Sequence, residues 1–406
     1  MKLIETILNQ MTEVSKFQKK FFMIVVQMFL AIQGKINFRS LSRYSGLSEK
    51  TFRRWFQKYF DFALFNTLAI EKLEKFEEVG CAIDACFLEK AGKVTYGIAH
   101  FWNGCKSKAE KGLETTLAAI INIKTKTAYP LYTEQTPSPK EINSMCNNEE
   151  ATRIDFYLSV ITKISDFIKK FTKILIGDGY YTKKKFIDGV LALGFTYVGK
   201  LRLDANLKIL YNGERKKALG RPKKFEKKCD VKQLDGFTFL KDIDEETRLY
   251  EGTFYSVCLE REIKVVAVTP VVGEQTPVAL LFSTDIKMNG EAVYLYYTAR
   301  FQIEFVLRDA QQFTGFGSCQ SRNKESIHFH TNMSLVAINI VKIQEQFESN
   351  QTKKTVFSML NHKIKNHNET LISRFFSLLD MDLTLIKSNP VYNDMVNYGV
   401  IFHDFA

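Results

Sequence analysis

The chain has 406 residues, of which 45% are hydrophobic, which is enough for several domains with sizeable cores. Its 57 Lys and Arg residues outnumber its 45 Asp and Glu residues, and the net charge of +12 favours a polyanionic partner such as nucleic acid. Seven cysteines form no CxxC pair, which argues against a zinc ribbon and predicts reduced thiols in a cytosol. The most apolar run, Phe21–Ile32, is too short to span a bilayer, so we expect a soluble cytoplasmic protein without a membrane partner.

Residues 1–78 are expected to form a helical DNA-binding region that contains a helix-turn-helix. Gly46 can supply the left-handed turn that ends the first helix, and Ser48 can cap the second. The second helix would bury its aromatic face and leave three basic side chains available to DNA: Lys50, Arg53 and Arg54. A helical hairpin with a solvated basic face is the alternative.

From residue 79 onward the pattern predicts a mixed α/β fold. Strands and helices are expected in the order Cys81–Leu88, Thr95–His100, Leu113–Tyr132, Glu149–Phe171 (helix), Lys173–Asp178, Lys183–Leu193 (helix) and Phe195–Leu201. Residues 205–285 begin with a basic stretch and continue with short β-like runs, which predicts an all-β insertion. A helix near Ala292–Phe313 follows, and residues 346–406 are expected to form a C-terminal helical region.

Three carboxylates are candidates for the chemistry. Asp84 and Asp178 are each predicted to close an apolar strand, and Glu304 is predicted to lie inside a helix. Carboxylate oxygens are the ligands that Mg²⁺ prefers, and converging carboxylates can hold metal ions against a phosphodiester. Taken singly, each has a structural alternative: a turn at Asp84, an Asx turn at Asp178 and an ion pair between Glu304 and Arg308.

The helix that contains Glu304 is predicted to have one polar face. At about 100° of rotation per residue, five side chains fall on that face: Tyr297, Arg300, Glu304, Arg308 and Gln311. Ala299, Ile303 and Ala310 fall on the opposite side and are suited to packing. This arrangement is typical of a helix that lies along the floor of an active site.

Two histidines are candidates for a second metal site. His328 and His330 alternate in Ser326–His330, which predicts that both face one side of a strand. An H-x-H metal site is one interpretation, and a hydrogen-bonded role near the carboxylates is the other.

The spacing Tyr297-x2-Arg300-x3-Glu304, preceded by two strand-end Asp residues, resembles the DDE transposases of bacterial insertion sequences. It is most similar to the branch with a Tyr-Arg-Glu-Lys signature, and Ile176-Gly-Asp178-Gly-Tyr180 resembles that group too. The resemblance implies an RNase H-like mixed sheet with flanking helices, formed by residues 79–204 and 286–345, with the β-rich insertion between them. It also implies that Asp84, Asp178 and Glu304 bind two Mg²⁺ ions, for which Mn²⁺ can substitute, and that Tyr297 and Arg300 contact DNA phosphates.

One position departs from this group. The signature has Lys seven positions after the Glu, and this chain has Gln311 there. A Gln side chain near the DNA cannot supply that charge. Arg308, on the same predicted helix face, is the hypothesised substitute cation.

The resemblance predicts a cut-and-paste transposase that cleaves DNA at the ends of an element and transfers the freed strands to target DNA. Its partners would be double-stranded DNA, as terminal inverted repeats and as target, and a second copy of the chain in the DNA complex. Such a protein would be cytoplasmic and associated with the nucleoid. The alternatives are an RNase H-like nuclease without strand transfer and a catalytically inactive DNA-binding protein derived from a transposase.

Overall fold

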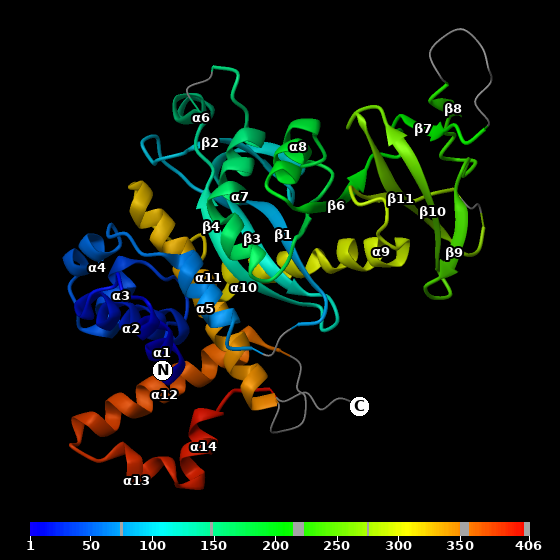
Figure 1. Ribbon diagram of the computed structural model, residues 1–406. Coiled ribbons are helices and arrows are strands. Elements are labelled where there is room, and N and C mark those ends of the chain that lie inside the picture. The colour runs from blue at the N-terminus through cyan, green and yellow to red at the C-terminus, as the bar shows by residue number, and fades with distance from the viewer. Residues whose placement is uncertain (74–75, 147–148, 214–222, 274–275, 350–356, 402–406) are drawn as a thin grey trace.

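The computed structural model describes residues 1–73, 76–146, 149–213, 223–273, 276–349 and 357–401. The chain begins with five helices that lie together on one side of the molecule (Figure 1). They are α1 (Lys2–Gln10), α2 (Lys16–Ala31), α3 (Phe38–Ser45), α4 (Glu49–Trp55) and α5 (Phe62–Ile70). Gly46 has a φ of 74° after α3, and the Ser48 side chain accepts a hydrogen bond from Thr51 N at the start of α4. Both helix ends therefore lie where the local sequence predicted them.

The centre of the molecule is a mixed sheet in which five strands form the core. In spatial order they are β4 (Thr127–Gln135), β3 (Lys108–Asn122), β1 (Val79–Glu89), β5 (Ile174–Ile176) and β6 (Thr196–Leu201). The first three pair antiparallel, whereas β1, β5 and β6 are parallel. The short strand β2 (Ala99–Asn103) pairs with the start of β3. This order and mixture of directions confirm the RNase H-like mixed α/β fold expected from the sequence.

The predicted insertion continues this sheet. Strand β12 (Ala279–Ser283) pairs with β6, and the next strands are β11 (Arg261–Pro270), β10 (Thr247–Ser256), β7 (Leu207–Leu210) and β8 (Phe225–Lys228). Strand β9 (Thr238–Asp242) pairs with β10. In the described residues the core and the insertion thus share one twelve-stranded sheet, and the insertion projects to the right in Figure 1.

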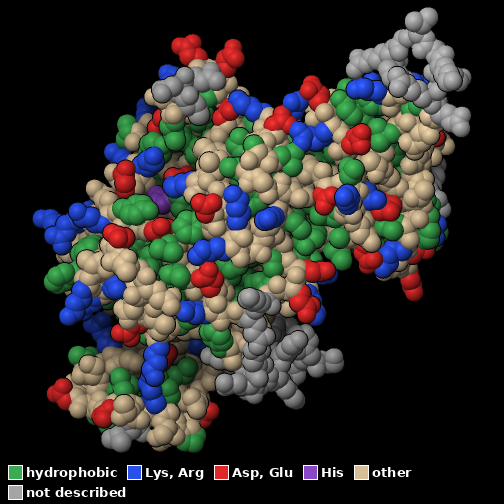
Figure 2. Space-filling model, in the orientation of Figure 1, with side chains coloured by type: hydrophobic (Ala, Val, Ile, Leu, Met, Phe, Trp, Pro, Cys, Tyr) green, Lys and Arg blue, Asp and Glu red, His purple; other side chains and the backbone are tan. Residues whose placement is uncertain are grey.

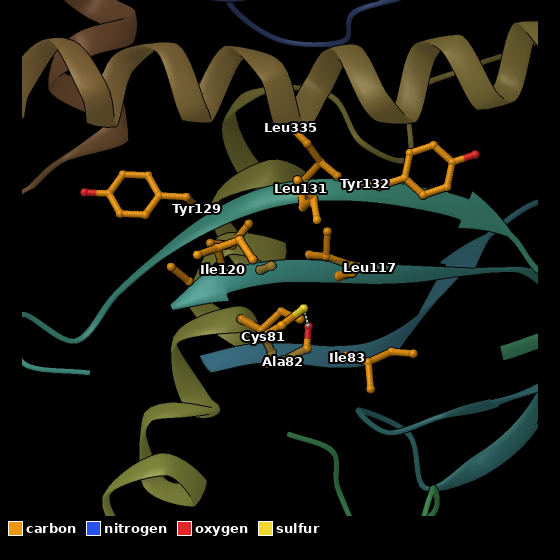
Figure 3. Close-up of a cluster of buried hydrophobic side chains, with 14 of the residues drawn as sticks. Cys81, Ala82, Ile83, Leu117, Ile120, Tyr129, Leu131, Tyr132 and Leu335 are labelled. Carbon is orange, nitrogen blue, oxygen red and sulfur yellow. Dashed lines mark hydrogen bonds between the residues drawn. The ribbon is translucent and has the colours of Figure 1, made fainter. Parts of the chain in front are cut away.

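Helices cover both faces of the core strands. Helix α7 (Arg153–Lys169) lies on one face, where Tyr157 donates to Glu114 of β3 at 2.6 Å. Helices α10 (Phe301–Phe313) and α11 (Lys324–Ser349) lie on the other face, against β1 and β4 (Figure 1). Shorter helices precede and follow α7: α6 (Pro139–Cys146) and α8 (Lys184–Ala192). A cluster of buried side chains from β1, β3, β4 and α11 includes Ile83, Leu117, Leu131 and Leu335 (Figure 3).

The C-terminal part is helical, as expected. It contains α12 (Met359–Leu378), α13 (Leu383–Lys387) and α14 (Pro390–Val396), and α12 packs on α2 of the N-terminal helices. The ammonium of Lys363 is buried and donates to Ile32 O and, at 2.9 Å, to Phe29 O at the end of α2. No helix of the described residues has the length and apolar character that a bilayer span requires.

Sequence predictions for several elements differ from the structure, and the strand predicted over Thr95–His100 begins only at Ala99. The predicted strand Leu113–Tyr132 is two strands, because a turn at residues 123–126 separates β3 from β4. The helix predicted over Ala292–Phe313 is divided at Arg300 into α9 (Gly290–Ala299) and α10. His328 and His330 lie in helix α11 and not in a strand, so they point to different sides and form no H-x-H site.

Candidate active site

Asp84 lies on β1, and Asp178 follows the end of the neighbouring parallel strand β5. Ala82 of β1 is paired with Ile176 of β5, and each Asp follows its strand's paired residue by two positions. Neighbouring strands lie about 4.8 Å apart, and the charge of Asp178 affects the pKa of Asp84, so the two carboxylates lie near each other. The two aspartates are thus brought together by the register of two strands.

The position of Asp84 corrects one expectation. Strand β1 continues to Glu89 through its pairing with β3, so Asp84 lies in the middle of the strand and not at its end. Strand β5 is short and ends at Ile176, so Asp178 does follow a strand end. Asp178 Oδ1 accepts a hydrogen bond from Tyr180 N at 2.9 Å, which is the Asx turn considered from the sequence.

Arg300 links the third carboxylate to the first. Its Nη2 donates to Glu304 Oε1 at 2.9 Å, and its Nη1 donates to Asp84 Oδ2 at 3.3 Å. Arg300 lies at the junction of α9 and α10 and is only 7% exposed, whereas the Glu304 side chain is 46% exposed. The guanidinium therefore contacts both a half-buried acid on the sheet and an exposed acid on the helix.

The three acids also interact electrostatically. Burial raises the pKa of Asp84 to about 7, and the Arg300 charge opposes that rise. Asp178 and Glu304 each raise the pKa of Asp84 further, because a nearby negative charge disfavours its ionised form. These effects on Asp84 place Asp178 and Glu304 near it, and we call the three side chains the acidic centre.

The donor set fits a divalent metal ion by its chemistry. It consists of carboxylate oxygens, which Mg²⁺ and Mn²⁺ prefer, and a cation already lies between two of them. In the described residues, no group of three His, Cys, Asp or Glu side chains is arranged to hold a metal ion as it stands.

Two buried polar atoms near these acids have no partner among the described residues. They are Nε of Arg300 and the hydroxyl of Tyr181. The charge of Asp84 raises the pKa of Tyr181 after the larger effect of its burial, so the hydroxyl lies near the acidic centre. Tyr181 lies three positions after Asp178 in the sequence, and this proximity is the signal that could have indicated it.

The other residues of the predicted polar helix face lie at different depths. Tyr297 is buried, and its ring centroid is 5.8 Å from the Arg300 guanidinium carbon. Arg308 is exposed, contacts Asp309 Oδ1 at 3.3 Å and lies over the ring of Phe305.

Gln311 is exposed, and its Nε2 donates to Cys86 Sγ at 3.0 Å. Cys86 is two residues beyond Asp84 on β1, so Gln311 borders the acidic centre.

The predicted DNA-contacting residues of the helix-turn-helix lie apart from the acidic centre. Lys50, Arg53 and Arg54 are exposed on α4, on the left of the molecule in Figure 1. Lys and Arg side chains gather over this edge of the surface (Figure 2). Arg53 contacts Glu49 Oε2 at 3.4 Å and lies over the ring of Phe38.

A mixed sheet with two aspartates at neighbouring parallel strands and a glutamate on a crossing helix defines a protein of the RNase H-like class. Residues 157–340 match the family described as Transposase DDE domain, and this segment includes Asp178, Arg300 and Glu304. The chain therefore contains a transposase DDE domain, which confirms the resemblance to DDE transposases. A search of curated proteins found no match.

Proposed function

We propose that this transposase cleaves DNA at the ends of a bacterial insertion sequence and transfers the freed strands to target DNA. The observation that carries the proposal is the convergence of Asp84, Asp178 and Glu304 around Arg300. In the first step, water attacks the phosphorus at the element end, and the bond to the 3′-oxygen breaks to release a 3′-hydroxyl. In the second step, that hydroxyl attacks a target phosphorus and displaces the 3′-oxygen of the target strand.

The three carboxylates would hold the metal ions, for which we propose two Mg²⁺ ions, replaceable by Mn²⁺. When bound, such ions activate the attacking oxygen and stabilise the leaving oxygen. Arg300 would move from the carboxylates to the DNA phosphate, where its unpaired Nε supplies a further donor. Tyr297, packed beside Arg300, would hold the guanidinium in place and contact the same phosphate. Arg308 would supply the positive charge that Gln311 lacks. Gln311, at the edge of the acidic centre, would donate a hydrogen bond to the DNA.

DNA-end recognition would fall to the helix-turn-helix. Its exposed Lys50, Arg53 and Arg54 suit contacts with phosphates or base edges of the terminal inverted repeats. We place the protein in the cytoplasm, associated with the nucleoid.

A homodimer would join two element ends, with the C-terminal helices as the proposed contact. Several apolar side chains of these helices are exposed, among them Leu371, Phe375, Leu378, Val391 and Met395. Some of them line a groove of about 540 Å³ between α12 and α14.

Strand transfer with pre-cleaved ends tests the proposal against its two rivals. The wild-type protein should join such ends to a target plasmid in Mg²⁺, and D84N should bind the ends without joining them. Cleavage of intact ends without any joined product would favour the nuclease. Binding that is equal in wild type and D84N, with no cleavage by either, would favour the inactive DNA-binding protein.

A further inference from the structure

A polar cavity lies where the helix-turn-helix meets the catalytic core. Its volume is about 340 Å³, and its lining residues are Phe38, Arg39, Glu49, Arg53 and Gln320. The first four belong to α3 and α4, whereas Gln320 belongs to the loop between α10 and α11. The cavity thus joins side chains that are more than 250 positions apart in the sequence.

The two halves of this cavity are held firmly together. The ring of Phe329 in α11 packs against Phe56 at a centroid distance of 4.4 Å and against Phe62 at 5.2 Å. His330 of the same helix packs on Phe29 and hydrogen-bonds Gly315 O at 2.8 Å. Because these rings are buried, the cavity is a fixed feature of the fold.

The charges of the cavity suit an anion. Arg39 is exposed and makes no hydrogen bond or ion pair within the described part of the chain. Arg53 contacts Glu49 at 3.4 Å, but both side chains stay largely exposed, so this ion pair contributes little. Two guanidinium groups and the Gln320 amide offer several N–H donors, which is the set that recognises phosphate oxygens.

The Gln320 loop is also tied to the strand that carries Asp84. Lys90, which follows β1 directly, donates from Nζ to Cys319 O. A ligand that contacts Gln320 is therefore connected to β1, the strand of Asp84, through Cys319 and the side chain of Lys90.

We propose that this cavity binds one backbone phosphate of the DNA end through Arg39, Arg53 and Gln320. The inference rests on the proposed function and extends it, because it assigns Arg39 and Gln320 to DNA binding. It also places a DNA contact between the helix-turn-helix, which recognises the DNA, and the core, which cleaves it. The helix-turn-helix and the core then hold the same DNA strand, and the cavity fixes the spacing between the recognised sequence and the cleaved phosphate.

Fluorescence anisotropy at several salt concentrations tests this site, with a labelled duplex that the wild-type protein selects from a random pool. R39Q should lower the affinity about tenfold and reduce the slope of log K against log salt by about one. Q320A should lower the affinity a few-fold with little change in slope. E49Q should raise the affinity a few-fold, because it removes the negative charge beside Arg53. R374Q, which removes an exposed charge on α12, is the matched control and should bind as the wild type does.

Methylphosphonate substitution of single phosphates locates the contact on the DNA. One neutral position should weaken binding to the wild type and have no further effect on R39Q. Wild-type affinity and slope in both R39Q and E49Q would overturn the cavity proposal while leaving the proposed catalysis intact. Failure of the wild type to select any duplex would instead overturn the proposed function, and the cavity assignment with it.

Discussion

The guanidinium of Arg300 contacts the carboxylate of Asp84 at 3.3 Å, although the two residues are 216 positions apart. The same guanidinium contacts Glu304 at 2.9 Å, so one buried cation forms ion pairs with an acid on the sheet and with an acid on the helix. Without a metal ion, this contact offsets part of the repulsion among the three acids.

Loss of the Arg300 charge should destabilise the protein. R300Q leaves the half-buried Asp84 without its cation, and breaking such a largely buried pair from one side costs about 3 kcal/mol. R300K keeps the positive charge, but a single ammonium cannot contact both carboxylates as the guanidinium does. We therefore expect a smaller loss of stability for R300K than for R300Q. Urea denaturation at neutral pH measures both. R374Q, at an exposed position on α12, is the control and should change the free energy of unfolding by less than about 0.5 kcal/mol.

The two rim residues of α10 should affect DNA binding in opposite directions when changed. R308A removes the exposed cation proposed to contact phosphate, so affinity for element ends should fall about fivefold. Q311K introduces a charge beside Cys86 and should raise the affinity by a similar factor. Anisotropy with end DNA measures both. If R308A leaves binding and cleavage unchanged, Arg308 does not replace the missing Lys.

His330 should make the stability depend on acid pH. Burial lowers the pKa of His330 to about 4, and the nearby Lys90 lowers it further, whereas the hydrogen bond to Gly315 O raises it. Between pH 6.5 and 4, the unfolded chain binds a proton here that the folded protein does not bind. This residue should therefore reduce the free energy of unfolding by up to about 3 kcal/mol as the pH falls through that window.

H330Q provides the comparison, because a Gln amide can donate to Gly315 O and does not titrate. It should be less stable than the wild type at pH 7.5, and the difference should shrink or reverse at pH 4.5. Chemical denaturation at the two pH values measures it. An equal difference at both would show that His330 does not carry the predicted linkage.

Two glycines with positive φ should differ in their tolerance of Ala. Gly46 has a φ of 74° with open space around an added Cβ, so G46A should cost about 1 kcal/mol. Gly315 has a φ of 69°, and an added Cβ would lie 2.9 Å from Ile36 Cβ. G315A should therefore cost about 1 to 3 kcal/mol more than G46A, because it adds a clash to the strained backbone. Equal losses in urea denaturation would contradict the close packing of Ile36 on this loop.

The sequence predicted best where local rules decide the structure. Gly46 and Ser48 determine the two helix ends of the helix-turn-helix through their own backbone and side-chain hydrogen bonds. Asp84 was placed wrongly because pairing with β3, a distant segment, determines where β1 ends. The strand predicted around His328 was wrong for a related reason. A pattern of five residues cannot distinguish a strand from the start of a long buried helix.

The sequence predicted residue types for the candidate site but not their contacts. Acids after apolar runs and the Arg-x3-Glu spacing indicated the candidate side chains. The ion pair from Arg300 to Asp84, the contact from Gln311 to Cys86 and the cavity shared with Gln320 all join distant segments. Such tertiary contacts depend on strand register and helix packing, which no local pattern contains.

The central claim is that Asp84, Asp178 and Glu304 hold divalent metal together. Mn²⁺ binding to the DNA-bound protein, followed by electron paramagnetic resonance, tests it most directly. D84N, D178N and E304Q should each lower the Mn²⁺ affinity at least about tenfold. D188N, which removes an acid of α8 that pairs with Lys184, should bind Mn²⁺ as the wild type does. Wild-type Mn²⁺ affinity in any of the three active-site variants would contradict the claim.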